Sequence, residues 1–165
     1  MNELVSIIIT TYYRNEPLRI ALMSAINQYY RPIEIIVVDD SGEQHAKSVV
    51  DEYEDIKYIT HDDNKGQIAA WETGFNNSNG KFIQFQDDDD FLRKDKISSQ
   101  IKKMKNGKCG VIYSGLINID GTAYHPQESI RGQVLEHALR HEMTPCQTTS
   151  MLIKKSSLSP IFPLK

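Results

Sequence analysis

Four consecutive aspartates, at residues 87–90, directly follow the apolar run FIQFQ. Adjacent carboxylates repel one another, and a carboxylate that leaves water is costly unless something pairs with it. Side chains two apart in an extended segment point the same way, so we expect Asp87 and Asp89 to share a face as an Asp-x-Asp pair, with Asp88 and Asp90 pointing to the other face. Mg²⁺ and Mn²⁺ favour oxygen ligands, and Mg²⁺ typically takes one or two carboxylates plus phosphate oxygens. The tetrad therefore predicts a divalent-cation site, with a solvated acidic loop that caps the next helix as the alternative.

A second acidic pair, Asp39 and Asp40, follows another β-prone run, IEIIVV. In parallel sheets, ligands bind outside the carboxyl ends of the strands, where the strand order reverses. Both acidic clusters are therefore expected to face one crevice. The alternative for Asp39 and Asp40 is that they cap the following helix.

The elements that would position these acids are Val- and Ile-rich runs alternating with amphipathic stretches of helical length, which is typical of βα units in a mostly parallel sheet. Strands are expected at residues 5–10, 33–38, 56–60 and 81–86, and helices at 17–30, 43–54, 67–78 and 95–106. Beyond Cys109 the alternation stops. There we expect strands at 109–119 and 122–125, joined by an Asp120-Gly121 turn, a helix at 132–142 and a last strand at 150–155.

Length and composition describe one ordinary globular domain. The chain has 165 residues, 39% hydrophobic and 25% charged, and a net charge of -3, which argues against a disordered chain or a general nucleic-acid binder. It shows no signal peptide and no run near the ~18 apolar residues that span a bilayer. A cytoplasmic protein is expected. Cys109 and Cys146 have no Cys-x-x-Cys spacing, so reduced thiols are expected.

Other motifs for metals and phosphates fit poorly. From Asp87, the positions that an EF-hand calcium loop gives to Gly and Glu hold Leu92 and Ser98. No G-x-x-x-x-G-K-[ST] loop occurs, and no G-x-G-x-x-G follows the first strand. His137 and His141 lack the Glu that the zinc-protease motif requires after the first His.

Taken together, the ordered motifs VSIIITTYYR, EIIVVDDSG, NKGQIAAWETG and GKFIQFQDDDDF resemble those of the family 2 glycosyltransferases. The resemblance covers nearly the whole chain. It implies a GT-A fold, a Rossmann-like three-layer α/β sandwich with a mostly parallel central sheet. It also implies a single domain over residues 1–165, with nucleotide-binding βα units in 1–107 and the start of the acceptor-side half in 108–165.

The resemblance assigns roles residue by residue. Asp40, with Asp39 beside it, matches the carboxylate that accepts a hydrogen bond from uracil N3–H, and Asp89, with Asp87, matches the ligands of a Mn²⁺ or Mg²⁺ ion that bridges the donor diphosphate. The other matched positions line the base, the ribose or the diphosphate: Thr10, Tyr12, Arg14, Lys65, Gly66, Asp87 and Asp88. Taken singly, these residues have structural alternatives as strand-end, capping or turn residues. The family often has Arg-Asn where this chain has Trp71 and Glu72, so Lys65 or Arg14 is the candidate replacement for that positive charge, and Trp71 is expected in the core.

The implied reaction is transfer of a sugar from a nucleotide diphosphate sugar, usually a UDP-sugar, to a saccharide or lipid-linked acceptor, with inversion. The expected setting is the cytoplasm, including the inner face of the membrane. We expect a chain truncated relative to the family, with the general base beyond Lys165; Asp120, Glu128 and Glu142 are fallback candidates without matching context. The alternatives are a non-catalytic nucleotide-sugar-binding module and a nucleotidyltransferase, which should show a Gly-rich loop after the first strand.

Overall fold

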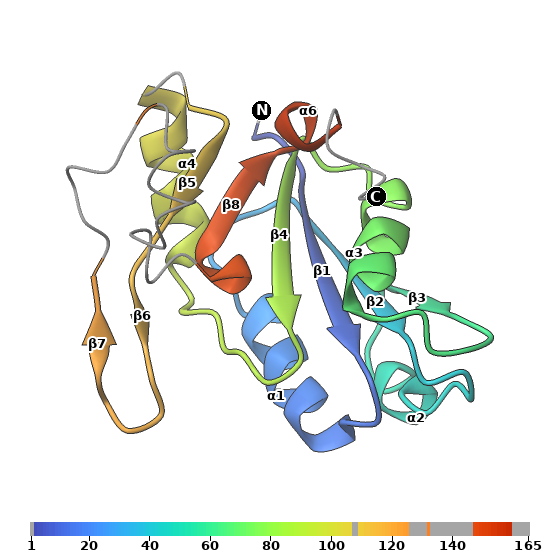
Figure 1. Ribbon diagram of the computed structural model, residues 1–165. Coiled ribbons are helices and arrows are strands. Elements are labelled where there is room, and N and C mark those ends of the chain that lie inside the picture. The colour runs from blue at the N-terminus through green and yellow to red at the C-terminus, as the bar shows by residue number, and fades with distance from the viewer. Residues whose placement is uncertain (1, 107–108, 126–131, 133–146, 160–165) are drawn as a thin grey trace.

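The main sheet has six strands in the order β3-β2-β1-β4-β8-β5 (Figure 1). The computed structural model describes residues 2–106, 109–125, 132 and 147–159. The strands are β1 (Val5–Thr11), β2 (Ile33–Asp39), β3 (Ile56–Thr60), β4 (Phe82–Asp87), β5 (Val111–Tyr113) and β8 (Met151–Lys154). β1 to β4 run parallel, whereas β8 is antiparallel to β4 and β5. The strands expected in the first half of the chain are confirmed to within one residue at each end.

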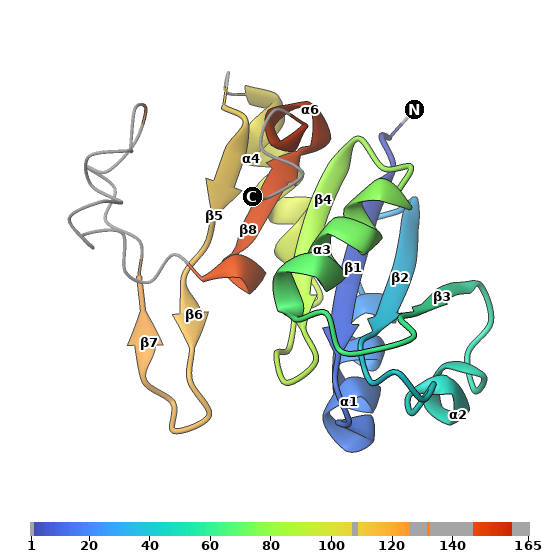
Figure 2. The ribbon, with the colours of Figure 1, turned by 45° about the vertical axis from the view of Figure 1, so that its right-hand side comes forward.

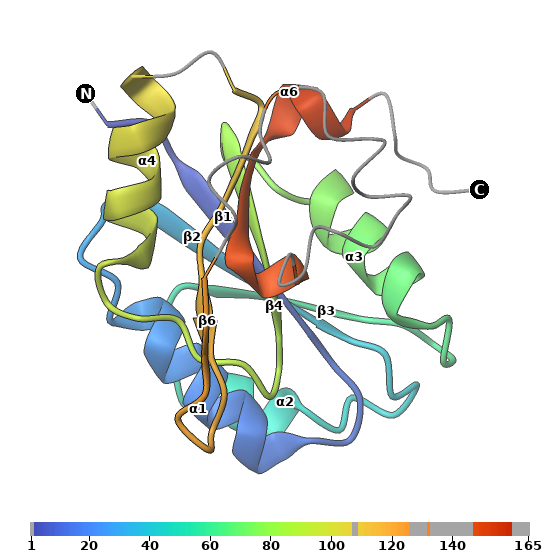
Figure 3. The ribbon, with the colours of Figure 1, turned by 60° about the vertical axis from the view of Figure 1, so that its left-hand side comes forward.

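Helices cover both faces of the sheet, which Figure 3 shows nearly edge-on. The helices are α1 (Asn15–Ile26), α2 (Lys47–Val50), α3 (Gln67–Asn76), α4 (Lys96–Asn106) and α6 (Lys155–Leu158), with a 3₁₀ turn η1 (Thr148–Ser150). In β1, Ile7 and Ile9 pack with α1, α2 and α4, whereas Ile8 packs with α3 and α6. Each of these Ile side chains is fully buried, which contributes about 1.5–3 kcal/mol per side chain. The predicted three-layer α/β sandwich is confirmed.

The register of the parallel strands aligns their carboxyl ends. Thr11 of β1 pairs with Asp39 of β2, and Thr10 pairs with Asp87 of β4. The chain runs outward from β1 through β2 to β3 and then returns to place β4 on the other side of β1. The order reverses at β1, so the ends of β1, β2 and β4 border one crevice, as expected for a ligand site in an open α/β sheet.

The second half of the chain departs from expectation in one place. The run 109–119 was expected as one strand, but it divides into β5, which joins the main sheet, and β6 (Leu116–Ile117), which pairs with β7 (Ala123–Tyr124). Figure 2 shows this β6-β7 hairpin extending away from the main sheet. The Asp120-Gly121 turn is confirmed, with Gly121 at φ 85° and its N–H donating to Asn118 O at 2.9 Å.

All four helices expected before residue 107 are shorter than expected, although α3 and α4 stay within two residues of their expected bounds. The stretch 43–54 contains only α2, because Gln44 has φ 57° and the Ala46 N–H donates to the Asp39 carboxylate. The helix expected at 17–30 spans Asn15–Ile26 instead. Gly107 and nearly all of the helix expected at 132–142 lie outside the described residues. Within the described part of the chain, no helix combines the length and the apolar character needed to cross a membrane.

Candidate functional site

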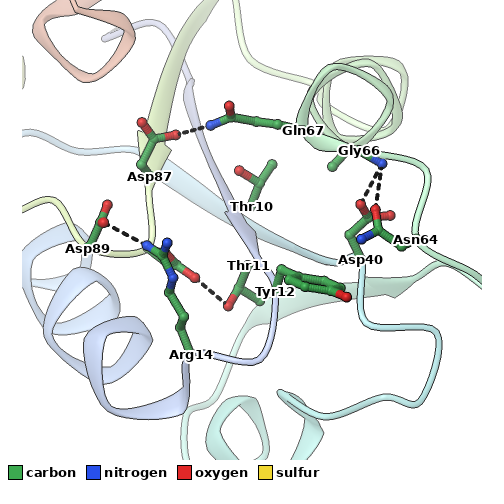
Figure 4. Close-up of a pocket in the computed structure, with 12 residues that line it drawn as sticks. Thr10, Thr11, Tyr12, Arg14, Asp40, Asn64, Gly66, Gln67, Asp87 and Asp89 are labelled. Atoms are coloured by element: carbon green, nitrogen blue, oxygen red, sulfur yellow. Dashed lines mark hydrogen bonds and ion pairs between the residues drawn. The ribbon is translucent and has the colours of Figure 1, made fainter.

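A cavity of about 420 Å³ lies at the carboxyl ends of β1, β2 and β4 (Figure 4). Its lining comes from the loop after β1, the end of β2, the start of α3 and the acidic turn after β4. The lining residues are Thr10, Thr11, Tyr12, Arg14, Asp40, Asn64, Gly66, Gln67, Ala70, Asp87, Asp88 and Asp89. Eight of the ten predicted site residues are therefore brought together in one cavity, and the exceptions are Asp39 and Lys65.

The loop after β1 presents an aromatic ring and a cation. Tyr13 adopts the left-handed region with φ 55°, and its hydroxyl donates to Ser41 O at 3.1 Å. The Tyr12 ring is 49% exposed and meets the Tyr13 ring edge to face at 4.8 Å. Tyr12 therefore offers an aromatic surface on which a planar base could stack. Arg14 follows at the mouth of the cavity.

The two acids after β2 have different surroundings. Asp39 is fully buried and accepts hydrogen bonds from Ser41 N, Ala46 N and the Tyr58 hydroxyl at 2.6–2.9 Å. Burial opposes ionisation of Asp39, but these hydrogen bonds outweigh it and lower the pKa of the carboxyl. The Asp39 side chain is directed into the core, and Asp39 is not among the residues that line the cavity. Asp39 anchors the loop that follows β2, which corresponds to the capping alternative.

Asp40 points the other way and lines the cavity. Its Oδ1 accepts the Lys65 N–H at 2.9 Å, and its Oδ2 accepts the Gly66 N–H at 2.8 Å. Gly66 has φ 85°, a conformation that favours glycine, and a Cβ there would meet no protein atom within 4 Å. The Lys65 ammonium lies 3.7 Å from Asp63 and outside the cavity lining. Lys65 therefore contributes its backbone N–H to the site, not its charge.

The acidic tetrad departs from the predicted alternation. β4 ends at Asp87 and the chain turns at residues 88–89, so Asp87, Asp88 and Asp89 all line the cavity while Asp90 does not. Asp87 accepts from Gln67 Nε2 at 2.7 Å, and Asp88 accepts from Thr11 Oγ1 at 2.7 Å. The expectation that Asp88 points away from Asp87 and Asp89 is wrong, because the strand geometry ends before Asp88.

Charge in the tetrad is incompletely compensated. Burial, reinforced by Asp90 and Asp89, raises the pKa of Asp87 to about 6. Burial also raises the pKa of Asp88, although Thr11 and Arg14 oppose the shift. Among the described residues that line the cavity, Arg14 is the only basic one, and Asp88 and Asp89 raise the pKa of its guanidinium. Three carboxylates with one guanidinium form a suitable environment for an additional cation.

The carboxylate oxygens in the cavity suit a cation for which the protein supplies only some of the ligands. No group of three or more His, Cys, Asp and Glu side chains within the described ranges is arranged to hold a metal ion alone. Mg²⁺ typically takes one or two carboxylates and completes its shell with phosphate oxygens and water. Asp89 is suited to such a role because its side chain is 56% exposed and next to Asp88 and Arg14.

Several residues in and next to the cavity were not predicted from the sequence. Thr11, Asn64, Gln67 and Ala70 line the cavity without having been predicted. Asn64 and Gln67 flank the Lys65-Gly66 pair in NKGQ, and that adjacency was the available signal. His61 lies just behind the cavity, with its Nδ1 2.6 Å from Asp40 Oδ1. Nothing in its local sequence indicates that it contacts Asp40.

Other candidates fall elsewhere. Trp71 packs against Phe85 with the ring centroids 5.6 Å apart, in agreement with the core interpretation. Asp120 lies in the β6-β7 turn, outside the cavity lining. Glu128, Glu142, His137 and His141 lie outside the described residues.

Comparison with known proteins finds glycosyltransferases among the relatives of this chain. The chain is 32% identical over 142 residues to the UDP-Glc:alpha-D-GlcNAc-diphosphoundecaprenol beta-1,3-glucosyltransferase WfaP of Escherichia coli, covering 82% of this chain and 57% of the relative. The solved structure of S. aureus TarS 1-349 with UDP-GlcNAc matches with a TM-score of 0.77 at 18% identity, over 94% of this chain and 46% of that one. The mannosyltransferase PcManGT from Pyrobaculum calidifontis, solved with GDP-Man and Mn²⁺, matches with a TM-score of 0.70 at 18% identity, over 96% of this chain and 46% of that one.

These matches confirm the expected GT-A fold, and the chain spans about half the length of the three proteins named here. The family model described as "Glycosyl transferase family 2" matches residues 6–162. The match extends over most of the chain and includes every residue that lines the cavity, so the chain belongs to glycosyl transferase family 2.

Proposed function

We propose that this chain carries the donor site of a glycosyltransferase that moves a sugar from a UDP-sugar to a hydroxyl of a lipid-linked saccharide. The observation that carries the proposal is the convergence of Asp40, Gly66 and the acids of residues 87–89 on one cavity at the point where the strand order reverses. A volume of about 420 Å³ suits a nucleotide-sized ligand.

In this proposal, different residues of the chain contact the base, the ribose and the diphosphate of the donor. The uracil stacks on Tyr12, and its N3–H donates to the Asp40 carboxylate, which can only accept. Thr10, Asp87 and Asp88 face the ribose, and the bare backbone at Gly66 allows close approach of the nucleotide. Asp89, with Asp87, would hold Mn²⁺ or Mg²⁺ against the diphosphate, with Arg14 beside it. When bound, the cation neutralises charge that grows on the leaving diphosphate.

The division of the chain follows from the same assignment. All twelve lining residues lie between Thr10 and Asp89, within residues 1–107. We assign the donor half to residues 1–107 and the start of the acceptor half to 108–165. The general base that takes the proton of the acceptor hydroxyl is not one of the lining residues in this assignment.

The relatives support the finer parts of the proposal. The E. coli relative is named for UDP-Glc, for a diphosphoundecaprenol-linked acceptor and for a beta-1,3 linkage, and the two solved structures hold UDP-GlcNAc in one case and GDP-Man with Mn²⁺ in the other. We therefore propose a uridine donor, a divalent cation, an inverting reaction and action in the cytoplasm at the inner face of the membrane.

Calorimetric titration with UDP, GDP and dTDP in Mn²⁺ tests the donor assignment, and incubation with UDP-sugars and an undecaprenyl-diphosphate-linked sugar tests transfer. We expect UDP to bind more tightly than GDP and dTDP, and the glycosylated lipid to form together with free UDP. Selective UDP binding without sugar transfer would favour a non-catalytic binding module. Pyrophosphate formed from UTP and a sugar 1-phosphate would point to a nucleotidyltransferase.

A further inference from the structure

The Asp40 carboxylate lies between the cavity and the core, and its two oxygens accept different numbers of hydrogen bonds. Its side chain is 7% exposed. Oδ1 accepts from His61 Nδ1 at 2.6 Å and from Lys65 N at 2.9 Å, whereas Oδ2 accepts from Gly66 N at 2.8 Å. A carboxylate has about four lone-pair positions, and the described residues supply three donors. One acceptor position on Oδ2 remains for a ligand in the cavity.

His61 is held on both sides. Its side chain is also 7% exposed, and its Nε2 lies 2.8 Å from Thr73 Oγ1 on α3. Its backbone N–H donates to Asp39 O at 3.0 Å, which ties the end of β3 to the end of β2. The ring therefore links the cavity carboxylate to α3, and it cannot turn without breaking one buried and one partly buried hydrogen bond.

This arrangement fixes which imidazole nitrogen carries a proton. Asp40 only accepts, so Nδ1 must be the donor. The Thr73 hydroxyl can donate to Nε2 when the ring is neutral and can accept from it when the ring is charged. In both protonation states the Nδ1–H bond points at Asp40, and the carboxylate keeps its acceptor position toward the cavity. A ring N–H of the ligand satisfies that position, whereas a ring nitrogen lone pair is repelled by it.

We propose that His61, supported by Thr73, is a positioning residue that sets the base selectivity of this site by holding Asp40 as an acceptor for the N3–H of uracil. The inference rests on the proposed uridine donor. Cytosine has the same size and carries a lone pair at N3, so the contact that His61 fixes discriminates UDP from CDP. A histidine that only filled the core would support both nucleotides equally.

The test compares UDP with CDP on variants of one position. An Asn side chain places its amide nitrogen near the Nδ1 position of His, and a Gln side chain places it near Nε2. Dissociation constants for UDP and CDP are measured by calorimetry in Mn²⁺ for the parent, His61→Asn, His61→Gln and His61→Ala, with the melting temperature of each. Imidazole ¹⁵N NMR of the parent, with His61→Asn as the assignment control, reports the tautomer without any nucleotide.

We expect His61→Ala to weaken UDP binding about tenfold while CDP binding stays unchanged, which is the scale of one buried hydrogen bond. His61→Asn should retain most of the preference for UDP, and His61→Gln should lose it. Equal losses for UDP and CDP, an unchanged ratio in His61→Ala, or a parent without preference would overturn the inference. An Nε2–H tautomer would also overturn it. If the Nδ1–H tautomer is present but the parent binds no nucleotide, the contact stands and the proposed uridine donor fails.

Discussion

Arg14 Nη1 lies 2.6 Å from Asp89 Oδ2 and 3.3 Å from Asp88 Oδ1, at the mouth of the cavity. The guanidinium thus pairs with Asp88 and with Asp89, and Asp89 carries oxygens to which the proposed cation would bind. A divalent ion and Arg14 compete for these oxygens, and a bound diphosphate gives the released guanidinium a second anionic partner.

Arg14→Ala should therefore have opposite effects on two ligands. Without nucleotide, Mn²⁺ should bind the variant up to about fivefold more tightly, because an exposed ion pair is worth up to about 1 kcal/mol. UDP in saturating Mn²⁺ should bind more weakly by a similar factor. Electron paramagnetic resonance of free Mn²⁺ and calorimetry of UDP measure the two effects. Weaker Mn²⁺ binding by the variant would show that Arg14 does not compete with the ion.

Gly66 and Gly121 form a matched pair of positions. Both have φ 85°, and a Cβ at either would meet no protein atom within 4 Å, but only Gly66 lines the cavity. Replacement by Ala should cost each variant about 1–2 kcal/mol of unfolding free energy, because an L side chain is strained in this backbone conformation. Only Gly66→Ala should also lose about tenfold in UDP affinity. Equal UDP affinities in the two variants would mean that the nucleotide does not approach Gly66.

The raised pKa of Asp87, at about 6, predicts a pH dependence of stability in chelator-treated protein. An unfolded Asp releases its proton near pH 4, so between about pH 4 and 6 the folded state binds more protons than the unfolded state. The unfolding free energy should therefore fall by about 1–2 kcal/mol as the pH rises through this window. Asp87→Asn should make this fall smaller by the share of Asp87 and leave the share of Asp88, whose pKa is also raised. Asp63→Asn, at a side chain that is 74% exposed, should retain it. Urea denaturation at stepped pH measures the difference, and identical profiles for parent and Asp87→Asn would contradict it.

The lowered pKa of Lys96 predicts a second pH range, above the first, in which the unfolding free energy changes with pH. Its ammonium donates to Gln84 Oε1 and, at 2.8 Å, to Gln100 Oε1, and burial lowers its pKa to about 7. Between about pH 7 and 10 the unfolded state keeps a proton that the folded state has released, so the unfolding free energy should rise with pH.

We expect this rise to be about 1–3 kcal/mol larger in the parent than in Lys96→Met. The control, Lys102→Met, lies on the exposed side of α4 and should keep the parent slope. Urea denaturation from pH 7 to 10 measures the slope of the unfolding free energy against pH. A slope in Lys96→Met equal to that of the parent would show that Lys96 stays charged in the folded state.

The hydrophobic pattern predicted the strands well, because β1 and β2 are buried on both faces and their Ile and Val runs admit few alternatives. The cavity could be predicted because the acids lie directly at the ends of β2 and β4. The helix at 43–54 was overestimated because Asp39 takes the Ala46 N–H, a contact between residues that are close in space but not within one helical turn.

The roles of individual side chains were harder to predict. Asp39 and Asp40 are neighbours of the same type, and only the direction of each side chain separates the buried anchor from the cavity residue. His61 has no local signal, because its contacts with Asp40 and Thr73 join β2, β3 and α3. Asp88 was misplaced because a period-2 rule does not hold where β4 ends in a turn.

The most direct measurement is the affinity for UDP with Mn²⁺ and with chelator, in the parent, in Asp89→Asn and in Asp51→Asn, an exposed aspartate outside the cavity lining. If the acidic turn holds a cation that holds the diphosphate, Mn²⁺ should strengthen UDP binding at least about tenfold in the parent and in Asp51→Asn, and should have little effect in Asp89→Asn. An undiminished Mn²⁺ effect in Asp89→Asn, or none in the parent, would contradict a donor site built on the acidic turn.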